Sequence, residues 1–267
     1  MQPLASVPAR ALAHIDCVLL DIDDTLTTDG RLTADAYAAL EQLHQERFTV
    51  VPITGRPAGW CDHIARMWPV SGVVGENGAF WMRYDAAAKK LAKRFVASDA
   101  ERAANRLRLA EIGKRIVSEV PGSALASDQL YRETDVAIDF CEDVMPLTTE
   151  DVDRIVALMR SEGMTAKISS IHVNGWFGSY DKLAMTRIFF DEGLHRNLDE
   201  TRDRCVFVGD SPNDAPMFAY FPLSIGVANI AQFIDRVSTP PAYTTTSECG
   251  AGFVEVAERL LSIRKSA

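Results

Sequence analysis

Two carboxylates directly follow the first strongly apolar run of the sequence. Residues 18–20 are Val, Leu and Leu, and the run stops at Asp21 and Asp23. Alternate residues of a strand point the same way, so these two acids can share one site if the strand is just ending. Buried parallel strands deliver such residues to the carboxyl edge of an α/β sheet, where ligands bind. The spacing therefore indicates a chemically active site.

Further polar groups stand at comparable positions, where other apolar runs end or predicted helices begin: Thr54, Gly55, Lys182, Asp210, Asn213 and Asp214. Gathered at one sheet edge, they would combine several carboxylates with an ammonium group, a hydroxyl group and the free N–H groups of a glycine turn. Clustered carboxylates repel one another unless a cation joins them, and an all-oxygen ligand set favours Mg²⁺ over zinc or copper. The set therefore predicts a magnesium site.

The same groups could hold a phosphoryl group. The Thr54 hydroxyl, the Gly55 amide and the Lys182 ammonium group would contact its oxygens, with Asn213 as a further phosphate contact. Phosphoryl transfer needs mainly this kind of positioning and charge stabilisation. Arg56 follows Gly55 and could hold a substrate or cap a neighbouring element, and the sequence leaves both interpretations open.

Asp214 and Lys182 each stand at the start of a predicted helix, so a structural role must be weighed for both. Ser211, Pro212 and Asp214 fit an N-cap, a first helical proline and the acid of a capping box, so Asp214 could cap a helix, serve the site, or do both. Lys182 is a cation in the first turn of a predicted helix, where it opposes the macrodipole, whereas Asp181 suits the cap. This unfavourable local placement favours a functional role for Lys182.

Strands and helices alternate at both ends of the chain, which predicts an α/β fold with a doubly wound parallel sheet. Thr33 suits the N-cap of the first long helix. Pro52 is unusual in a strand, because proline cannot donate to a central ladder. The expected strands cover 15–20, 48–54, 71–74, 205–210 and 224–227, and the expected helices cover 33–46, 57–67, 182–193, a segment from 212, and 250–264.

A different pattern interrupts this alternation. Residues 80–96 suggest a hairpin or extended arms, and the following helices and strands suggest a small α+β unit with its own core. We therefore predict a doubly wound core formed by 1–79 and 179–267 and an inserted domain formed by 80–178. The helices expected in the insert cover 99–120 and 149–162, and its strands cover 129–141 and 167–173.

Composition limits the function further. The chain has 267 residues and a formal charge of −9, which opposes binding to nucleic-acid phosphates. Residues 1–14 read as a loose lead-in, and no long uncharged apolar stretch suggests a membrane span, so we expect a cytoplasmic protein. Five scattered cysteines without a Cys-x-x-Cys pair predict reduced, mostly structural thiols.

Four motifs in order, DxDxT from Asp21, TGR from Thr54, Lys182 and GDSxND from Gly209, resemble those of the haloacid dehalogenase superfamily. The resemblance implies a Rossmann-like core. It also implies that Asp21 is the nucleophile forming an aspartyl-phosphate and Asp23 the general acid and base. It makes the Asp21 carboxylate, the Asp23 main-chain carbonyl and Asp210 the Mg²⁺ ligands, with Asp214 in support. A carboxylate at Asp23 points to a phosphatase or a phosphomutase.

An insert between the second and third motifs is similar to the large cap of subclass IIB, which covers the active site. Residues 75–79 and 209–214 resemble those of sucrose-phosphate and mannosyl-3-phosphoglycerate phosphatases, although Gly55-Arg56-Pro57 departs from the latter group. Cap residues able to contact a sugar would come from two stretches, and Trp176 could instead pack at the hinge. With Arg56, the expected substrate contacts are Arg132, Glu133, His172 and Asn174.

The resulting prediction is a Mg²⁺-dependent phosphomonoester hydrolase acting through an aspartyl-phosphate on a small phosphorylated sugar or sugar-like metabolite. A phosphomutase is the alternative within the enzymes, and a non-catalytic phospho-receiver or sugar-phosphate sensor is the alternative outside them. We expect neither nucleic acid nor membrane as a partner. The sequence assigns no oligomeric state.

Overall fold

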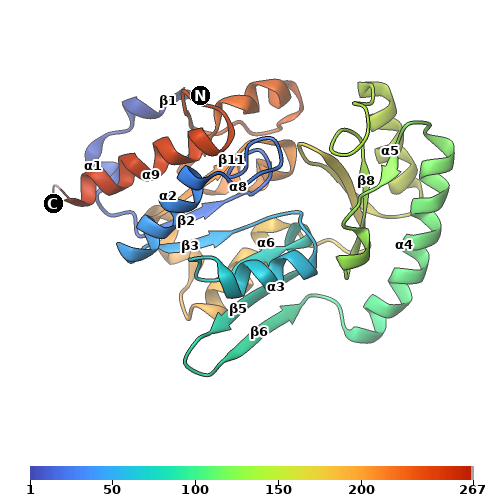
Figure 1. Ribbon diagram of the computed structural model, residues 1–267, viewed down its shortest axis with the longest axis horizontal. Coiled ribbons are helices and arrows are strands. Elements are labelled where there is room, and N and C mark those ends of the chain that lie inside the picture. The colour runs from blue at the N-terminus through green and yellow to red at the C-terminus, as the bar shows by residue number, and fades with distance from the viewer. Residues whose placement is uncertain (266–267) are drawn as a thin grey trace.

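The computed structural model describes residues 1–265, and its core is a six-stranded sheet in which every neighbouring pair is parallel (Figure 1). The strand order is β1-β13-β12-β11-β2-β3. The predicted doubly wound α/β fold is confirmed. The strands are β1 (Gln2–Pro3), β2 (Cys17–Leu20), β3 (Thr49–Pro52), β11 (Cys205–Gly209), β12 (Leu223–Gly226) and β13 (Tyr243–Thr244).

Helices cover both faces of this sheet. Alternate residues of β2 and β11 enter two different clusters, because strand side chains point to opposite faces. One cluster packs under α2 (Ala34–Gln45) and α9 (Cys249–Lys265), and the other under α6 (Lys182–Ile188) and α8 (Ala215–Tyr220). The Thr33 hydroxyl accepts from the Ala36 amide at 3.3 Å, which confirms the predicted N-cap.

Pro52 ends β3, and β3 is the last strand of the six-stranded sheet. Proline is tolerated at that edge because the missing donor interrupts no central ladder. One isolated bridge, Ile53 to Val74, leads on to β4 (Val73–Gly75). Between the two strands runs α3 (Ala58–Met67).

The hairpin of β5 (Phe80–Asp85) and β6 (Lys90–Phe95) pairs with β4 in a separate three-stranded sheet. Its buried residues, Phe80 among them, pack against α3. The predicted hairpin is confirmed, but it packs against the core. The division predicted at residue 80 therefore assigns to the cap a hairpin whose contacts are with core elements.

The cap contains a four-stranded antiparallel sheet, in the order β7-β8-β10-β9, with two long helices (Figure 1, right). The helices are α4 (Asp99–Glu119), with a Ser98 capping box, and α5 (Thr149–Ser161). The strands are β7 (Ala124–Leu125), β8 (Asp135–Asp139), β9 (Thr165–Ile168) and β10 (His172–Trp176). Helices and strands share one hydrophobic cluster, so the predicted independent core is present.

Three predictions about elements were wrong in detail. Residues 129–131 form a 3-10 turn, and only the fully buried Asp135–Asp139 is a strand, where one half-exposed strand was expected over 129–141. The strand expected over 167–173 is two strands joined by a turn at 169–171. The first residues are an ordered segment with buried Leu4, Val7 and Leu12, because β1 pairs with β13 and α1 (Ala9–Leu12) packs on the core.

Short elements complete the part of the chain that the structure describes. They include α7 (Leu198–Thr201) and 3-10 turns at Glu76–Gly78, Pro212–Asp214 and Ala228–Arg236. All five cysteines are free, as predicted. Among residues 1–265, no helix combines the length and apolarity needed to cross a bilayer.

Candidate active site

The loop after β2 places Asp21 and Asp23 at the carboxyl edge of the sheet. The backbone folds back at once, because the Leu26 and Thr27 amides both donate to the Ile22 carbonyl oxygen, at 2.9 and 3.0 Å. Asp21 is buried, and the Asp23 side chain keeps 14% of its surface exposed. The strand thus ends where the two acids begin, as their spacing predicted.

Lys182 joins two of the acids. Its Nζ lies 2.7 Å from Asp21 Oδ1 and 2.7 Å from Asp214 Oδ1, and the side chain is almost fully buried. Burial alone would lower the pKa of Lys182, but Asp21 and Asp214 outweigh it and raise this pKa. The Asp181 side chain accepts from the Ala184 amide at 2.8 Å and caps α6, as predicted. Lys182 is therefore a permanent buried cation.

Asp21 lies under opposing influences. Burial is the largest influence and raises the pKa of Asp21 to about 8. Lys182 acts to lower this pKa, and repulsion from Asp214 and Asp23 acts to raise it. Asp210 is in a more extreme position: burial and repulsion from Asp21 and Asp214 raise its pKa well above the ordinary value. Asp210 has no cationic partner among residues 1–265, only the Thr25 hydroxyl, which donates at 3.0 Å, and a long contact from Asn229 at 3.4 Å.

The carboxylates fit a divalent cation. Oxygens of Asp21, Asp210 and Asp214 all lie within 4.8 Å of one another. Lys182 neutralises part of this charge, and Asp210 remains uncompensated in a buried position. An all-oxygen set of this kind suits Mg²⁺, which is bound through one or two carboxylates and phosphate oxygens.

Asp214 has both of the roles that the sequence left open. Its Oδ2 accepts from the Asp210 and Ser211 amides, at 3.1 and 3.3 Å, and completes a capping box with Ser211. Its Oδ1 holds Lys182. A Cβ at Gly209 would lie 2.5 Å from Asp214 Oδ2, so the glycine of the motif leaves room for this carboxylate.

The predicted phosphate contacts lie on the turn after β3. Thr54 is buried, and its hydroxyl accepts from the Arg56 amide at 3.0 Å. A Cβ at Gly55 would lie 3.1 Å from Asn77 Nδ2, so the turn passes close to that amide. Asn213 donates from Nδ2 to Asn77 Oδ1 at 3.1 Å, which links the fourth motif to the turn at Glu76–Gly78.

Two residues near the site, Asn77 and Asn229, received no role from the sequence, and Thr25 entered only as the threonine of the first motif. Asn77 is buried, has φ 54° and ψ 28°, and carries an Nδ2 group without a hydrogen-bond partner among the described residues. Asn229 donates to the Asp24 carbonyl oxygen at 2.9 Å, and Thr25 orients Asp210. The asparagine and glycine at 77–78 were the available signal for Asn77. No pattern in the sequence marked Asn229.

Arg56 holds acids of both domains. Its Nε donates to Asp23 at 2.8 Å, its Nη2 to Glu142 Oε1 at 2.6 Å, and its Nη1 to Asp128 Oδ2 at 3.2 Å. The guanidinium also stacks on the Trp60 ring. Burial alone would raise the pKa of Glu142, but His172 and Arg56 outweigh it and lower this pKa to about 2. Arg56 therefore positions Asp23 and contacts the cap.

The remaining predicted substrate contacts separate into two groups. Arg132 is enclosed by Asp128, Asp135 and the Gly55 carbonyl oxygen, and Asn174 donates to Asp135 at 2.9 Å. His172 Nε2 lies 2.8 Å from Glu142 Oε2. Glu133 forms an ion pair with Arg106 at 2.6 Å, on a groove lined by α3 residues and away from Asp23. Trp176 is buried, stacks on Tyr180 and does not line the cavity beside Asp23.

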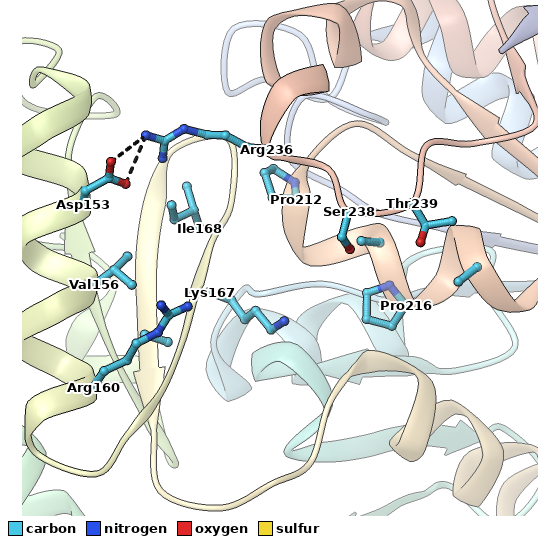
Figure 2. A pocket seen from close by; sticks show the side chains of 13 residues that line it. Asp153, Val156, Arg160, Lys167, Ile168, Pro212, Pro216, Arg236, Ser238 and Thr239 are labelled. Atoms are coloured by element: carbon cyan, nitrogen blue, oxygen red, sulfur yellow. Dashed lines mark hydrogen bonds and ion pairs between the residues drawn. The ribbon is translucent and has the colours of Figure 1, made fainter.

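A cavity of about 630 Å³ lies between the loop after β2 and the cap. Asp23, Arg56 and Glu142 line it, together with the buried Ser170. A second groove, of about 610 Å³, lies between α5 and β9 of the cap and Pro212 and Pro216 of the core, where Arg236 contacts Asp153 (Figure 2). The second groove contains none of the clustered acids, so the first is the candidate substrate cavity.

Comparison with known sequences agrees with this geometry. Residues 18–113 match the family described as haloacid dehalogenase-like hydrolase, and they include Asp21, Asp23 and the second motif. The other two motifs, Lys182 and Asp210 to Asp214, meet Asp21 in space. The match covers the N-terminal part of the chain, and in that part the chain is similar to haloacid dehalogenase-like hydrolases. A search of curated proteins gave no match.

Several solved structures share the fold over nearly their whole length. A Thermoplasma acidophilum protein aligns with a TM-score of 0.67 at 18% identity, over 92% of this chain and 98% of that one. A phosphatase of this superfamily from Bacteroides thetaiotaomicron has a TM-score of 0.60 at 18% identity, over 97% and 99%. The sucrose-phosphatase of Synechocystis, solved with sucrose and phosphate, has a TM-score of 0.58 at 16% identity, over 91% and 97%. The similarity extends over the core and the inserted cap, so the predicted fold with an inserted cap is confirmed.

Proposed function

We propose that this protein is a Mg²⁺-dependent phosphomonoester hydrolase of the haloacid dehalogenase superfamily that acts through an aspartyl-phosphate, on a small phosphorylated sugar or sugar-like metabolite. The observation that carries the proposal is the buried contact of Lys182 with Asp21 and Asp214, beside the uncompensated Asp210. Buried carboxylates arranged around one ammonium group suit a phosphoryl group with its metal ion better than they suit a neutral ligand. The phosphatases among the structural neighbours agree with this assignment.

The chain's own residues account for each proton and bond. An Asp21 carboxylate oxygen attacks phosphorus, the bond from phosphorus to the ester oxygen breaks, and Asp23 donates a proton to the leaving oxygen. Asp23 then removes a proton from a water molecule, which attacks the aspartyl-phosphate. The phosphorus–oxygen bond to Asp21 breaks, inorganic phosphate leaves, and both carboxylates return to their starting states.

Other residues position these groups. Lys182 and the Gly55 turn would contact phosphoryl oxygens, and Arg56 keeps Asp23 in place through the contact at 2.8 Å. Mg²⁺, when bound by Asp21 and Asp210 with Asp214 in support, would neutralise charge on the phosphoryl oxygens. The cap would exclude bulk water and select the leaving group.

Substitution of the nucleophile tests the proposal. Asp21→Asn should abolish release of inorganic phosphate from p-nitrophenyl phosphate in the presence of Mg²⁺, because an amide cannot form the acyl-phosphate. Its circular dichroism spectrum should match that of the wild type, since the side chain keeps its size. Phosphate release near the wild-type rate would eliminate the mechanism. Transfer of the phosphoryl group to a sugar without free phosphate would identify a phosphomutase instead.

A further inference from the structure

The cavity beside Asp23 is the place that a leaving group must occupy, because Asp23 is the acid that would protonate the leaving oxygen. Its volume of about 630 Å³ lies in the usual range for small-molecule pockets. The loop after β2 forms one wall, and the cap segments 141–143 and 170–171 form the other. The charges on these walls therefore meet the part of the substrate that differs from one phosphate ester to another.

Those walls are strongly acidic. They carry five carboxylates and two guanidinium groups: Asp23, Asp24, Asp29, Glu142 and Asp143 against Arg31 and Arg56. Arg56 is already bound to Asp23 and Glu142, and outside the cavity to Asp128. This guanidinium has three carboxylate partners and is buried, so it cannot serve as the receptor for an additional anion.

The other charged groups leave the cavity negative. Once Arg56, Asp23 and Glu142 are counted as one cluster, Asp24, Asp29 and Asp143 face only Arg31. Arg31 is exposed at the rim, whereas Asp24 is partly buried. The buried Ser170 also lines the cavity, and its hydroxyl group interacts with the Asp24 carboxylate. Such walls offer acceptors and negative charge to a ligand.

We propose that this cavity selects phosphate esters whose leaving group carries a protonated amine, such as an amino sugar or amino alcohol. Neutral polyols rank next, and leaving groups with a carboxylate or a second phosphate are rejected. The proposal rests on the proposed phosphatase function and adds the charge of the substrate to it. It also separates this chain from any phosphatase of phosphoglycerate-type esters, whose leaving groups are anionic.

Matched substrates test the proposal. The values of kcat/KM for phosphate release should fall in the order glucosamine 6-phosphate, glucose 6-phosphate, 6-phosphogluconate. Each step should be about tenfold, the size expected for a unit charge near carboxylates at a partly solvated site. A three-carbon series of amino-propanediol phosphate, glycerol 3-phosphate and 3-phosphoglycerate provides a second comparison for a smaller leaving group.

Charge-neutralising variants make the test specific. The double variant Asp29→Asn, Asp143→Asn should reduce the preference for amine over carboxylate by about tenfold, since both acids line the rim and are exposed. Asp29 has φ 50°, a conformation that asparagine tolerates well. Asp203→Asn is the matched control, because Asp203 is an exposed core carboxylate outside the cavity, and it should leave the preference unchanged.

The results distinguish a failure of the proposed selectivity from a failure of the proposed phosphatase function. The proposed selectivity is overturned if, in a series that is hydrolysed, the amine ester has a kcat/KM equal to or below that of the carboxylate ester. Hydrolysis of p-nitrophenyl phosphate with no turnover in either series also overturns it. Absence of phosphate release from p-nitrophenyl phosphate in the wild type overturns the phosphatase function itself.

Discussion

At the level of single residues, the site depends on buried charges that compensate one another only in part. Lys182 satisfies Asp21 and Asp214, whereas Asp210 has two neutral donors and no cation among the described residues. A buried carboxylate without a counter-charge costs free energy in the folded state. The metal-free protein is therefore expected to give up stability at Asp210 that a bound cation restores.

Asp210→Asn tests this balance. The variant should melt at least as high as the wild type without Mg²⁺, because the substitution removes a repelled buried charge. Mg²⁺ should raise the melting temperature of the wild type by a few degrees, and EDTA should reverse this rise. Mg²⁺ should not raise the melting temperature of Asp210→Asn. Differential scanning fluorimetry with and without Mg²⁺ measures both effects, and an equal increment in both proteins would contradict the assigned ligand.

Asn77 should contribute an N–H donor to the phosphate site. Its Nδ2 is buried, lacks a protein partner and lies against the Gly55 turn. Asn77→Gly keeps the left-handed backbone and should reduce kcat/KM by about 10–100-fold, the value of one hydrogen bond to a charged group. Asn77→Ala should lose the same activity and about 1 kcal/mol of stability in addition, because alanine is strained at φ 54°. Wild-type kcat/KM in the glycine variant would refute the role.

The chain's chemical residues could be predicted where a strand end or a motif marks them, as for Asp21, Thr54, Lys182 and Asp210. Asn77 and Asn229 could not be predicted in this way, because their roles arise from contacts across the fold, with Asn213 and with the Asp24 carbonyl. Arg56 shows the same limit. Its position was predicted, but its partners Asp128 and Glu142 lie 72 and 86 residues away in the cap.

At the level of elements, the parallel pairing of β2 with β11 brings the first and fourth motifs together. The register Leu20 to Val208 puts Asp21 next to the end of β11. Lys182, the third motif, reaches this edge in another way. It begins α6, which packs on the face of the sheet opposite α2 and α9. The turn at Gly78 supports this arrangement: this glycine packs against the Asp181 backbone, immediately before Lys182.

Gly78→Ala should therefore damage both stability and activity. Gly78 has φ +104°, and a Cβ would lie 2.0 Å from the Asp181 carbonyl oxygen. Backbone strain and overpacking together should cost about 3 kcal/mol or more, and displacement of Lys182 should reduce kcat. Gly163→Ala is the control: Gly163 has φ +76° with no atom within 4 Å of the added Cβ, so about 1–2 kcal/mol is expected. Urea denaturation compares the two, and equal losses would exclude the packing argument.

Local pattern predicted most of the core elements and fewer of the cap elements. The core strands are apolar runs closed by turn residues, and that signal is strong. Asp135–Asp139 is buried on both sides of its strand, although two of its five residues are aspartates, because Arg132 compensates Asp135 and backbone amides compensate Asp139. The alternation of apolar and polar residues over 129–141 therefore predicted a half-exposed strand, although the observed strand is fully buried. The hairpin at 80–95 was recognised, but its docking on β4 depends on distant contacts.

At the level of the whole molecule, cap and core are joined by polar links, and four of those within residues 1–265 stand out. Arg56 binds Asp128 and Glu142, Arg132 donates to the Gly55 carbonyl oxygen, and Arg236 pairs with Asp153 across the second groove (Figure 2). In the fourth link, the Glu76 carboxylate accepts from the amides of residues 133 and 134, at 2.9 and 2.7 Å. Three of these links surround the second motif, so the cap is connected to Asp23 through Arg56.

The link from Arg56 to Glu142 should show a defined pH dependence. The pKa of Glu142 falls from its ordinary 4.5 to about 2, so the carboxylate contributes stability that is fully present above about pH 4.5. This contribution is lost progressively as the pH falls from about 4.5 through about 2. Glu142→Gln should thus lower the free energy of unfolding by about 1–3 kcal/mol at neutral pH, the value of hydrogen bonds between charged groups.

Urea denaturation at about pH 7 and about pH 3.5 measures this difference, and the gap between wild type and Glu142→Gln should narrow at the lower pH. Glu111→Gln serves as the matched control, because Glu111 is an exposed cap residue whose ion pair with Lys114 should contribute about 0–1 kcal/mol at either pH. If the gap stays constant between the two pH values, Glu142 is not held as a low-pKa carboxylate by Arg56 and His172.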